Sequence, residues 1–390
     1  MLKFAVSLLA SVLPFAMNLA QAAGAPFYGD PPDARHPWAI HDRNRPQPPR
    51  VEPGPMQPCL PPADAIVLFD GTATSLTNWV PEKEGRELKW IVRDGALECV
   101  PRTGSICSKA EFGDCRLHIE WAAPKEVVGV SQEPGNSGIF LEGKVEIQVL
   151  DNYNNPTYAD GFACSIYGVC PPLANALRPS GEFQQVDITF RRPIYKDGKC
   201  IDPGYVTAFC NGVLMLNKAQ LEGPTGHKTR TKSGPLLERG PLKLQDHRCA
   251  VRFRNIWYQP LPSREPETGI QGPLSVEATA AQRKATADTI REDAAQSTNN
   301  PLEQMLRYAE ALVYYKDEAT YQKVEELATH YLAGLKTIPA NKLSAQKSKA
   351  RSVLQVFRYL AKHKIMSSDF GPHKELETLA HAQGWDKDLK

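Results

Sequence analysis

Between residues 65 and 262 the hydrophobic residues come in short runs that are interrupted by turn-forming residues. The runs at residues 66–69, 88–92 and 206–209 are followed by Asp70-Gly71, Asp94-Gly95 and Asn211-Gly212. Asp-Gly and Asn-Gly pairs between short apolar runs are typical of β-hairpins. Short strands at this spacing, with no helical pattern among them, predict a mainly β domain over residues 65–262, a β-sandwich or jelly roll.

Beyond residue 262 the apolar residues change to helical spacing. Leu302, Leu306, Ala309 and Val313 share one helix face. The pattern predicts helices at residues 277–296, 302–315, 320–335 and 343–363, within an α-helical appendage that covers residues 276–390. Its apolar stripe is what core packing requires, and its sequence contains no pattern of catalytic residues. The appendage could instead provide a surface that binds a protein partner.

The first 25 residues have the pattern of a secretory signal peptide. Lys3 precedes an apolar run at residues 4–19, and small residues continue to Ala25. A positive start, an apolar stretch and an Ala-x-Ala frame are the parts of such a signal. A membrane anchor is less favoured because Pro14 interrupts the run, and no later segment is apolar enough to span a bilayer. We expect cleavage after Ala22 or Ala25 and a periplasmic or secreted protein.

Residues 26–64 form a separate region that is rich in proline and scattered charge, and they predict a stiff, exposed linker. The chain has 33 prolines in 390 residues, whereas an average composition would give about 20. The 46 Lys and Arg nearly balance the 44 Asp and Glu, for a net charge of +2. This balance argues against a nucleic-acid-binding protein, which would carry a basic patch.

The nine cysteines are disulfide candidates if the protein is exported. No Cys-x-x-Cys pair occurs, and no Cys and His cluster has the spacing of a zinc finger, so the sequence does not indicate a structural zinc site. Because nine is odd, at least one thiol stays free or pairs between chains.

The run at residues 145–149 predicts a strand with one polar face. Its odd-numbered residues are Val or Ile and should face the core, which places Glu146 and Gln148 on the opposite face. Asp151 lies five residues after Glu146, on the wrong face of an ideal strand. A β-bulge would return it to the face of Glu146, and bulges are frequent beside active sites. The alternative is a solvated strand face without function.

A second strand, at residues 240–247, repeats this arrangement. Leu242 and Leu244 should face the core, whereas Lys243, Gln245 and His247 share the other face. Each of the two strands therefore presents an amide and an ionisable group, which predicts a polar, ligand-binding face. His247 is either a catalytic residue or a structural hydrogen bonder.

Strings in a fixed order along the β region carry a resemblance to a known family. They lie at residues 68–71, 136–139, 146–151, 166–168, 244–247 and 253–257. Together they resemble the 3-keto-disaccharide hydrolase domain family, from about Ala65 to Leu261. The resemblance implies a concanavalin-like jelly roll that acts on glycosides whose C3 hydroxyl has been oxidised to a ketone. The Glu-x-Gln-x-x-Asp spacing also resembles the active strand of laminarinase-type glycosidases, which share that architecture.

The chain departs from the family pattern at two places. Phe183 stands where members usually have Trp, and Cys164 and Cys170 flank the loop around Tyr167. Two cysteines that occur together in one loop of an exported protein predict a disulfide between them. Pairing of Cys164 with Cys115, or of Cys170 with Cys200, remains open. A Cys164–Cys170 bridge would hold Tyr167 toward the substrate.

The resemblance and the two polar strands together predict the chemistry. A ketone at C3 acidifies the proton on C2, so the glycosidic bond can break by deprotonation, elimination and hydration. This route needs a base, an acid and an oxyanion stabiliser. The candidate catalytic residues are Glu146, Asp151 and His247, and the candidate substrate-binding residues are Asn136, Gln148, Tyr167, Lys243, Gln245 and His227.

No cofactor is expected. Glu146, Asp151 and His247 are acceptable ligands for a divalent metal, but their scattered spacing has no metal-site signature. A carbohydrate is the expected ligand. The alternative function is a lectin-like, non-catalytic jelly roll that binds carbohydrate without a titrating acid–base pair.

Overall fold

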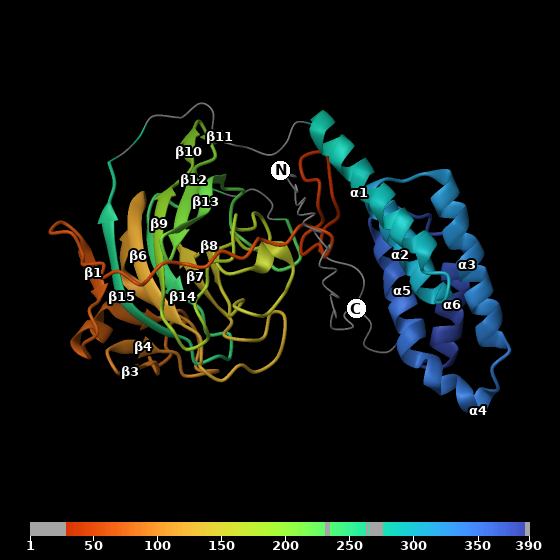
Figure 1. Ribbon diagram of the computed structural model, residues 1–390, viewed down its shortest axis with the longest axis horizontal. Coiled ribbons are helices and arrows are strands. Elements are labelled where there is room, and N and C mark those ends of the chain that lie inside the picture. The colour runs from red at the N-terminus through yellow and green to blue at the C-terminus, as the bar shows by residue number, and fades with distance from the viewer. Residues whose placement is uncertain (1–28, 231–234, 263, 265–275, 387–390) are drawn as a thin grey trace, which may run out of the picture.

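Two antiparallel β-sheets pack face to face in the first half of the structure (Figure 1). The computed structural model describes residues 29–230, 235–262, 264 and 276–386. The larger sheet has the order β13 (Val213–Gln220), β12 (Tyr205–Cys210), β9 (Gln184–Arg191), β6 (Cys115–Ala122), β15 (Arg252–Pro260), β4 (Ala96–Glu98) and β3 (Ile91–Arg93), with β1 (Ile66–Phe69) also paired to β15. The smaller sheet has the order β2 (Trp79–Pro81), β5 (Ile106–Phe112), β14 (Gly240–Leu244), β7 (Ser137–Leu141) and β8 (Val145–Val149). A hairpin of β10 (Ile194–Lys196) and β11 (Lys199–Asp202) stands apart from both.

The core between the sheets follows from strict alternation along the strands. In β9 every second residue is buried, and Val186, Ile188 and Phe190 belong to the main hydrophobic cluster. Ile147 of β8 and Leu242 of β14 enter the same cluster from the other sheet. Successive side chains of a strand point to opposite faces, so each sheet contributes one apolar face to the interior. The predicted mainly β sandwich with C-terminal helices is confirmed.

Two of the three predicted hairpin turns are present. Asp94 and Gly95 connect β3 to β4, and Asn211 and Gly212 connect β12 to β13, each as a two-residue loop. All four residues have positive φ angles, as a type I′ turn requires. The prediction from Asp70-Gly71 was wrong, because β1 leads into a short 3-10 helix, Thr74–Asn78, rather than into a hairpin partner.

The C-terminal region is a helical bundle with its own hydrophobic core. Its helices are α1 (Val276–Gln296), α2 (Pro301–Tyr314), α3 (Glu318–Lys336), α4 (Ala340–Leu343), α5 (Lys347–Lys362) and α6 (Gly371–Ala382). The helix predicted at residues 343–363 begins later, at Lys347, because a 3-10 turn separates α4 from α5. Helix α6 was not predicted, since Gly371 and Pro372 resemble a helix stop. Pro372 instead occupies the first turn of α6, where a proline has no hydrogen bond to lose.

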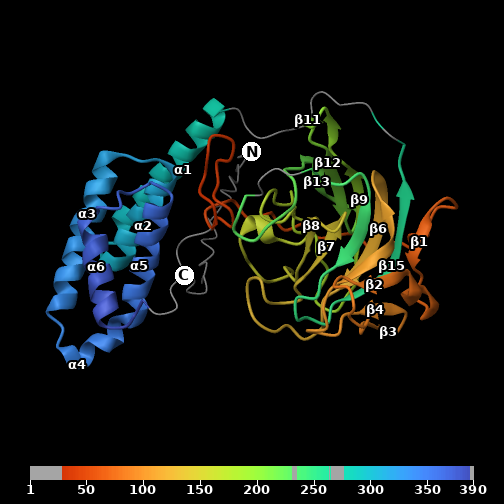
Figure 2. The same cartoon turned by 180° about the vertical axis from the view of Figure 1, so that it is seen from behind.

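Part of the proline-rich segment is buried, whereas its composition predicts an exposed linker throughout. Its first part, residues 29–45, is here called the first strap, and residues 50–64 are called the second strap. The first strap lies between the sandwich and the helices in both views (Figures 1 and 2). Residues 39–42 are buried, with exposed fractions between 0 and 4%. The amide of Asp30 donates to the Lys228 carbonyl of the sandwich, and the Tyr314 hydroxyl of α2 donates to Asp42.

No helix among the described residues is long and apolar enough to cross a membrane. The predicted signal peptide, residues 1–25, lies outside the described residues.

Candidate active site

Three neighbouring strands arrange six residues on the outer face of the smaller sheet. The register places Glu146 of β8 opposite Phe140 of β7, and Phe140 opposite Lys243 of β14. A parallel row joins Gln148, Gly138 and Gln245, in which the Gln245 amide donates to the Gly138 carbonyl at 3.0 Å. The sheet therefore brings the polar residues of both predicted strands together.

The chain around Tyr167 extends this face by one more strand-like row. The amide of Tyr167 donates to the Glu146 carbonyl at 3.1 Å, and the amide of Gln148 donates to the Ser165 carbonyl at 3.0 Å. Ile166 pairs with Ile147 and belongs to the core. Because side chains alternate along the backbone, Ser165 and Tyr167 take the side of Glu146 and Gln148.

Glu146 is buried, and its carboxyl group has no hydrogen-bond partner among the described residues. It is 8% exposed. A Cβ atom at Gly138 would lie 2.4 Å from its Oε1, so the glycine opposite it provides the space for the carboxyl group. Burial raises the pKa of Glu146 to about 8, although the positive charge of Lys243 lowers it. A carboxyl group with this pKa exchanges a proton near neutral pH.

Two amide oxygens on the same face also lack a hydrogen-bond donor from any residue that the structure describes. Gln148 is 2% exposed and donates from Nε2 to Gln132 at 3.0 Å, while its Oε1 has no hydrogen-bond partner. The Oε1 of Gln245 is buried and unpaired as well. Asn136 supports Gln132 by donating to its carbonyl at 2.6 Å. Buried acceptors without donors are costly, so this face is suited to a ligand that carries hydroxyl groups.

Lys243 places a cation beside this face. Its Nζ lies 3.9 Å from the centre of the Phe140 ring and 3.0 Å from the Glu82 carboxylate. The side chain is 16% exposed, and Glu82 is 40% exposed. The ammonium group is therefore held by a ring and a carboxylate at the margin of the face, close enough to influence the charge of Glu146.

A cluster of aromatic residues stands beside Glu146. The hydroxyl groups of Tyr158 and Tyr167 lie 2.9 Å apart, and the Tyr167 hydroxyl lies 3.1 Å from Nδ1 of His227. Burial raises the pKa of both tyrosines, so they stay neutral and can donate hydrogen bonds. Burial and the charges of neighbouring groups, first of them His41, lower the pKa of His227, so the ring is largely neutral at pH 7.

The first strap completes this cluster with His41. Its ring stacks on Tyr158 at 4.0 Å between centroids, and its Nδ1 lies 3.2 Å from Asp160. Its Nε2 is buried and has no hydrogen-bond partner in the described part of the chain. Burial raises the pKa of Asp160, but the hydrogen bond and charge of His41 outweigh it and hold that pKa below its usual range.

Asp151 and His247 are not placed beside Glu146 by the strands. The predicted bulge is wrong, because β8 pairs with β7 in an unbroken register and ends at Val149. Asp151 follows the strand end and accepts hydrogen bonds from Ser180 and from the Tyr153 amide. β14 ends at Leu244, so His247 lies in an exposed bend rather than on the strand face. Its charge still acts on His227.

The sequence interpretation missed His41, Tyr158, Asp160 and Gln132. His41 was assigned to a linker on composition alone. Its position in the short string Ala39-Ile40-His41-Asp42, the most apolar part of the proline-rich region, was the signal available. Tyr158 and Asp160 belong to a loop with no periodic pattern, so only the folded chain brings them to Glu146.

The cysteines and the metal candidates also differ from expectation. All nine cysteines are free thiols, and the predicted Cys164–Cys170 disulfide is not formed. Cys164 points into the core, where its thiol is hydrogen-bonded with Cys210. Glu146, Asp151 and His247 do not form a metal-binding group. Within the described residues one group of three ligands occurs, Cys59, His118 and Asp187, and it lies on the other sheet.

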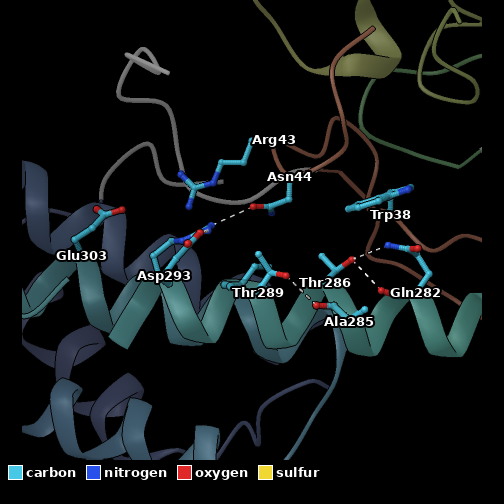
Figure 3. Close-up of a pocket in the computed structure, with 11 residues that line it drawn as sticks. Trp38, Arg43, Asn44, Gln282, Ala285, Thr286, Thr289, Asp293 and Glu303 are labelled. Carbon is cyan, nitrogen blue, oxygen red and sulfur yellow. Dashed lines mark hydrogen bonds and ion pairs between the residues drawn. The ribbon is translucent and has the colours of Figure 1, made fainter. Parts of the chain in front are cut away.

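A cavity of about 540 Å³ lies between the first strap and the helices (Figure 3). Trp38, Arg43 and Asn44 line it from the strap, opposite α1 and α2. Of its charged groups, Arg307 pairs with Asp293 at 2.7 Å, and Nε of Arg43 donates to Glu310 of α2 at 3.0 Å. The cavity therefore belongs to the attachment of the helices to the first strap.

Comparisons with known proteins agree with the β region. Residues 64–259, half of the chain, match the family described as the 3-keto-alpha-glucoside-1,2-lyase-like domain. A solved candidate glycosyl hydrolase from Parabacteroides distasonis ATCC 8503 is 40% identical over 56% of this chain and 93% of that chain, with a TM-score of 0.48. A second from the same organism is 21% identical over 51% of this chain and 94% of that chain, with a TM-score of 0.38. No curated protein matches the chain. The family match includes every strand residue of the polar face but not His41.

Proposed function

Because the chain belongs to the 3-keto-alpha-glucoside-1,2-lyase-like family, we propose that it cleaves the glycosidic bond of 3-keto-glycosides by elimination. The buried, unpaired carboxyl group of Glu146 on a face with unpaired amide oxygens is the observation that carries this proposal. A lectin-like function would require no group with a pKa shifted toward neutrality.

The reaction uses the acidity that the ketone gives to its neighbour. A base removes the proton from C2, and the electron pair forms an enolate with the C3 oxygen. The enolate then collapses and expels the C1 oxygen, which takes a proton and leaves as an alcohol. Addition of water across the resulting C1=C2 double bond gives the free 3-keto sugar. No oxidant or reductant is consumed in these steps.

Glu146 is the proposed base. Its pKa of about 8 makes it a stronger base than an ordinary carboxylate, while a useful fraction is still ionised near neutrality. Proton transfer from C2 neutralises a buried charge, so the burial that raises the pKa also favours the product of this step. Lys243, on the same sheet face, supplies positive charge for the developing enolate.

Tyr167 is the proposed acid for the leaving oxygen. Its hydroxyl is hydrogen-bonded with Tyr158 and His227, which can replace the proton that it gives away. Gln148 and Gln245 accept hydrogen bonds from sugar hydroxyls through their unpaired Oε1 atoms. His41 acts as a positioning residue because it packs against both tyrosines, with ring centroids 4.0 and 4.9 Å away.

We also propose that the protein is exported.

The test uses a 3-keto-glucoside beside its unoxidised parent. We expect release of the alcohol from the keto compound alone, since only the ketone acidifies C2. A substrate with deuterium at C2 should react more slowly, and reaction in D₂O should place deuterium at C2 of the product. Binding of both sugars without turnover of either would contradict the proposal and favour the lectin. Cleavage of the parent at an equal rate would exclude the elimination route.

A further inference from the structure

The outer face of the larger sheet carries a buried polar cluster that the proposed reaction does not use. In β6 the residues Leu117, Ile119 and Trp121 face the core, so His118 and Glu120 point to the outer face. Asp187 of β9 is paired directly opposite His118. The His118 side chain is fully buried and stacks against Trp257 at 5.1 Å between centroids.

The second strap covers this cluster and brings a cysteine to it. The side chain of Asn255 donates to the Cys59 carbonyl at 2.8 Å and to Glu120 at 3.1 Å. Gln185 donates to the Gln57 carbonyl, and this contact holds the strap over β9. Cys59 precedes the residues that match the family, so the cluster depends on a part of the chain outside that match.

The three side chains have the composition and spacing of a metal site. One ligand atom from each of Cys59, His118 and Asp187 lies within 4.8 Å of the other two. The ligands of a tetrahedral zinc site are about 3.3–3.8 Å apart, as its bond lengths require. Small rotations of the two partly exposed side chains, Cys59 and Asp187, would close this difference.

The two nitrogens of the His118 ring face different carboxylates. Nδ1 lies 3.2 Å from Asp187, and the buried Nε2 has no hydrogen bond within the described residues. The nearest charged group to Nε2 is Glu120, at 3.6 Å, and Glu120 is already bound by Arg254 at 2.7 Å. Nδ1 is therefore the nitrogen that a metal bound to Asp187 would use, and Nε2 is left to face Glu120.

We propose that Cys59, His118 and Asp187 bind a Zn²⁺ ion that fastens the second strap to the outer face of the larger sheet. Sulfur, imidazole nitrogen and carboxylate oxygen are all ligands that zinc accepts, and a water molecule would complete the tetrahedron. On binding, the thiol of Cys59 loses its proton to solvent and the thiolate bonds to zinc. Glu120 lies beside His118 as an outer carboxylate that orients the ring.

A catalytic triad of Cys, His and Asp is the competing interpretation of the same residues. The electrostatics oppose it: burial, and then the charge of Asp187, raise the pKa of the Cys59 thiol, whereas a nucleophilic cysteine needs a lowered pKa.

Cobalt(II) is the probe that tests the proposal, because a cobalt–thiolate bond gives a charge-transfer absorption band. The full-length chain without an affinity tag is stripped with a chelator and titrated with Co²⁺ and then with Zn²⁺. We expect one equivalent of Co²⁺ to produce the band and Zn²⁺ to displace it. Zn²⁺ should also raise the melting temperature, because an ion that binds only the folded state stabilises it.

Three variants make the result specific. Cys59→Ser should abolish the band and the thermal shift, with a loss of zinc affinity of at least about tenfold. Cys249→Ser, at another partly exposed cysteine, should keep both. Glu146→Gln should also keep both, which separates this site from the proposed active site. Absence of the band in the unaltered protein, or its survival in Cys59→Ser, would overturn the proposal.

Discussion

The two outer faces of the sandwich each contain a buried glutamate, and the two carboxyl groups behave in opposite ways. Glu146 on the smaller sheet is 8% exposed, and burial raises its pKa to about 8. Glu120 on the larger sheet is 5% exposed. Burial would also raise its pKa, but the neighbouring imidazole of His118 and hydrogen bonds from Asn255 and Arg254 lower it to about 2. Equal burial therefore gives opposite charge states at neutral pH.

The difference comes from the partners rather than from the depth of the group. A carboxylate with a guanidinium group and an amide donor is stable as an anion and has no reason to take a proton. A buried carboxyl group without a hydrogen-bond donor is free to bind a ligand or a proton. The comparison favours a structural role for Glu120 on the larger sheet and supports the proposed role of Glu146 in proton transfer on the smaller one.

Substitution of the two glutamates tests this comparison most strongly. Glu146→Gln should lower kcat by on the order of 10² or more, because it removes a base that acts only in the transition state. Steady-state kinetics with a 3-keto-glucoside measures the effect. Glu142→Gln is the control, since burial also raises the pKa of Glu142, to about 7, in the turn between β7 and β8. If the Glu146→Gln variant keeps most of the wild-type kcat, Glu146 is not the catalytic base.

Glu120→Gln should have the converse effect. The amide loses the charge-assisted bond to Arg254, and we expect the free energy of unfolding to fall by roughly 1.5–3 kcal/mol. The value of kcat should change less than twofold. Urea unfolding measures the first quantity and the same kinetic assay the second. Loss of turnover without loss of stability would reverse the interpretation of the two faces.

The pH dependence of stability should have opposite signs at the two glutamates. The raised pKa of Glu146 gives stability that is fully present below about pH 4.5 and is lost as the pH rises to about 8. The lowered pKa of Glu120 gives stability that is present above about pH 4.5 and is lost as the pH falls toward 2. Each effect is at most about 1.4 kcal/mol per pH unit. Unfolding of the wild type and each Gln variant across this range measures both slopes, and slopes of equal sign would contradict the assignment.

His41→Ala should reduce kcat by about tenfold, because it removes the ring that packs against the two tyrosines beside Glu146. Its matched control is His36→Ala on the same strap, where the ring binds Asp33 and Glu222. The His41 variant should keep its substrate KM, and Asn at the same position should restore part of kcat. Equal losses in the two histidine variants would indicate that the strap contributes stability alone.

His247→Ala should have the smallest effect. The side chain lies in an exposed bend, so its influence on His227 is screened by solvent. We expect kcat to change less than about threefold, with the pH–rate profile otherwise unchanged. If the pH–rate profile of this variant loses one limb, His247 takes part in catalysis.

The local patterns of the chain determined the sandwich and half of the polar face. Period-2 alternation predicted that Glu146 and Gln148 share one face, and the same rule placed Lys243 and Gln245 together. Asp94-Gly95 and Asn211-Gly212 predicted their hairpins because few other pairs adopt two positive φ angles. These features depend on neighbours a few residues away, and a sequence displays them directly.

Tertiary structure alone decided what surrounds those side chains. The missing donor at Glu146, the stacking of His41 on Tyr158 and the placement of Cys59 over His118 all join residues that are distant in sequence. Composition predicts an exposed linker at the first strap, but residues 39–42 are buried because the folded sandwich and helices enclose them. A pKa depends on solvation and partners in three dimensions, so the sequence could nominate Glu146 as an acid or base without determining whether it holds a proton.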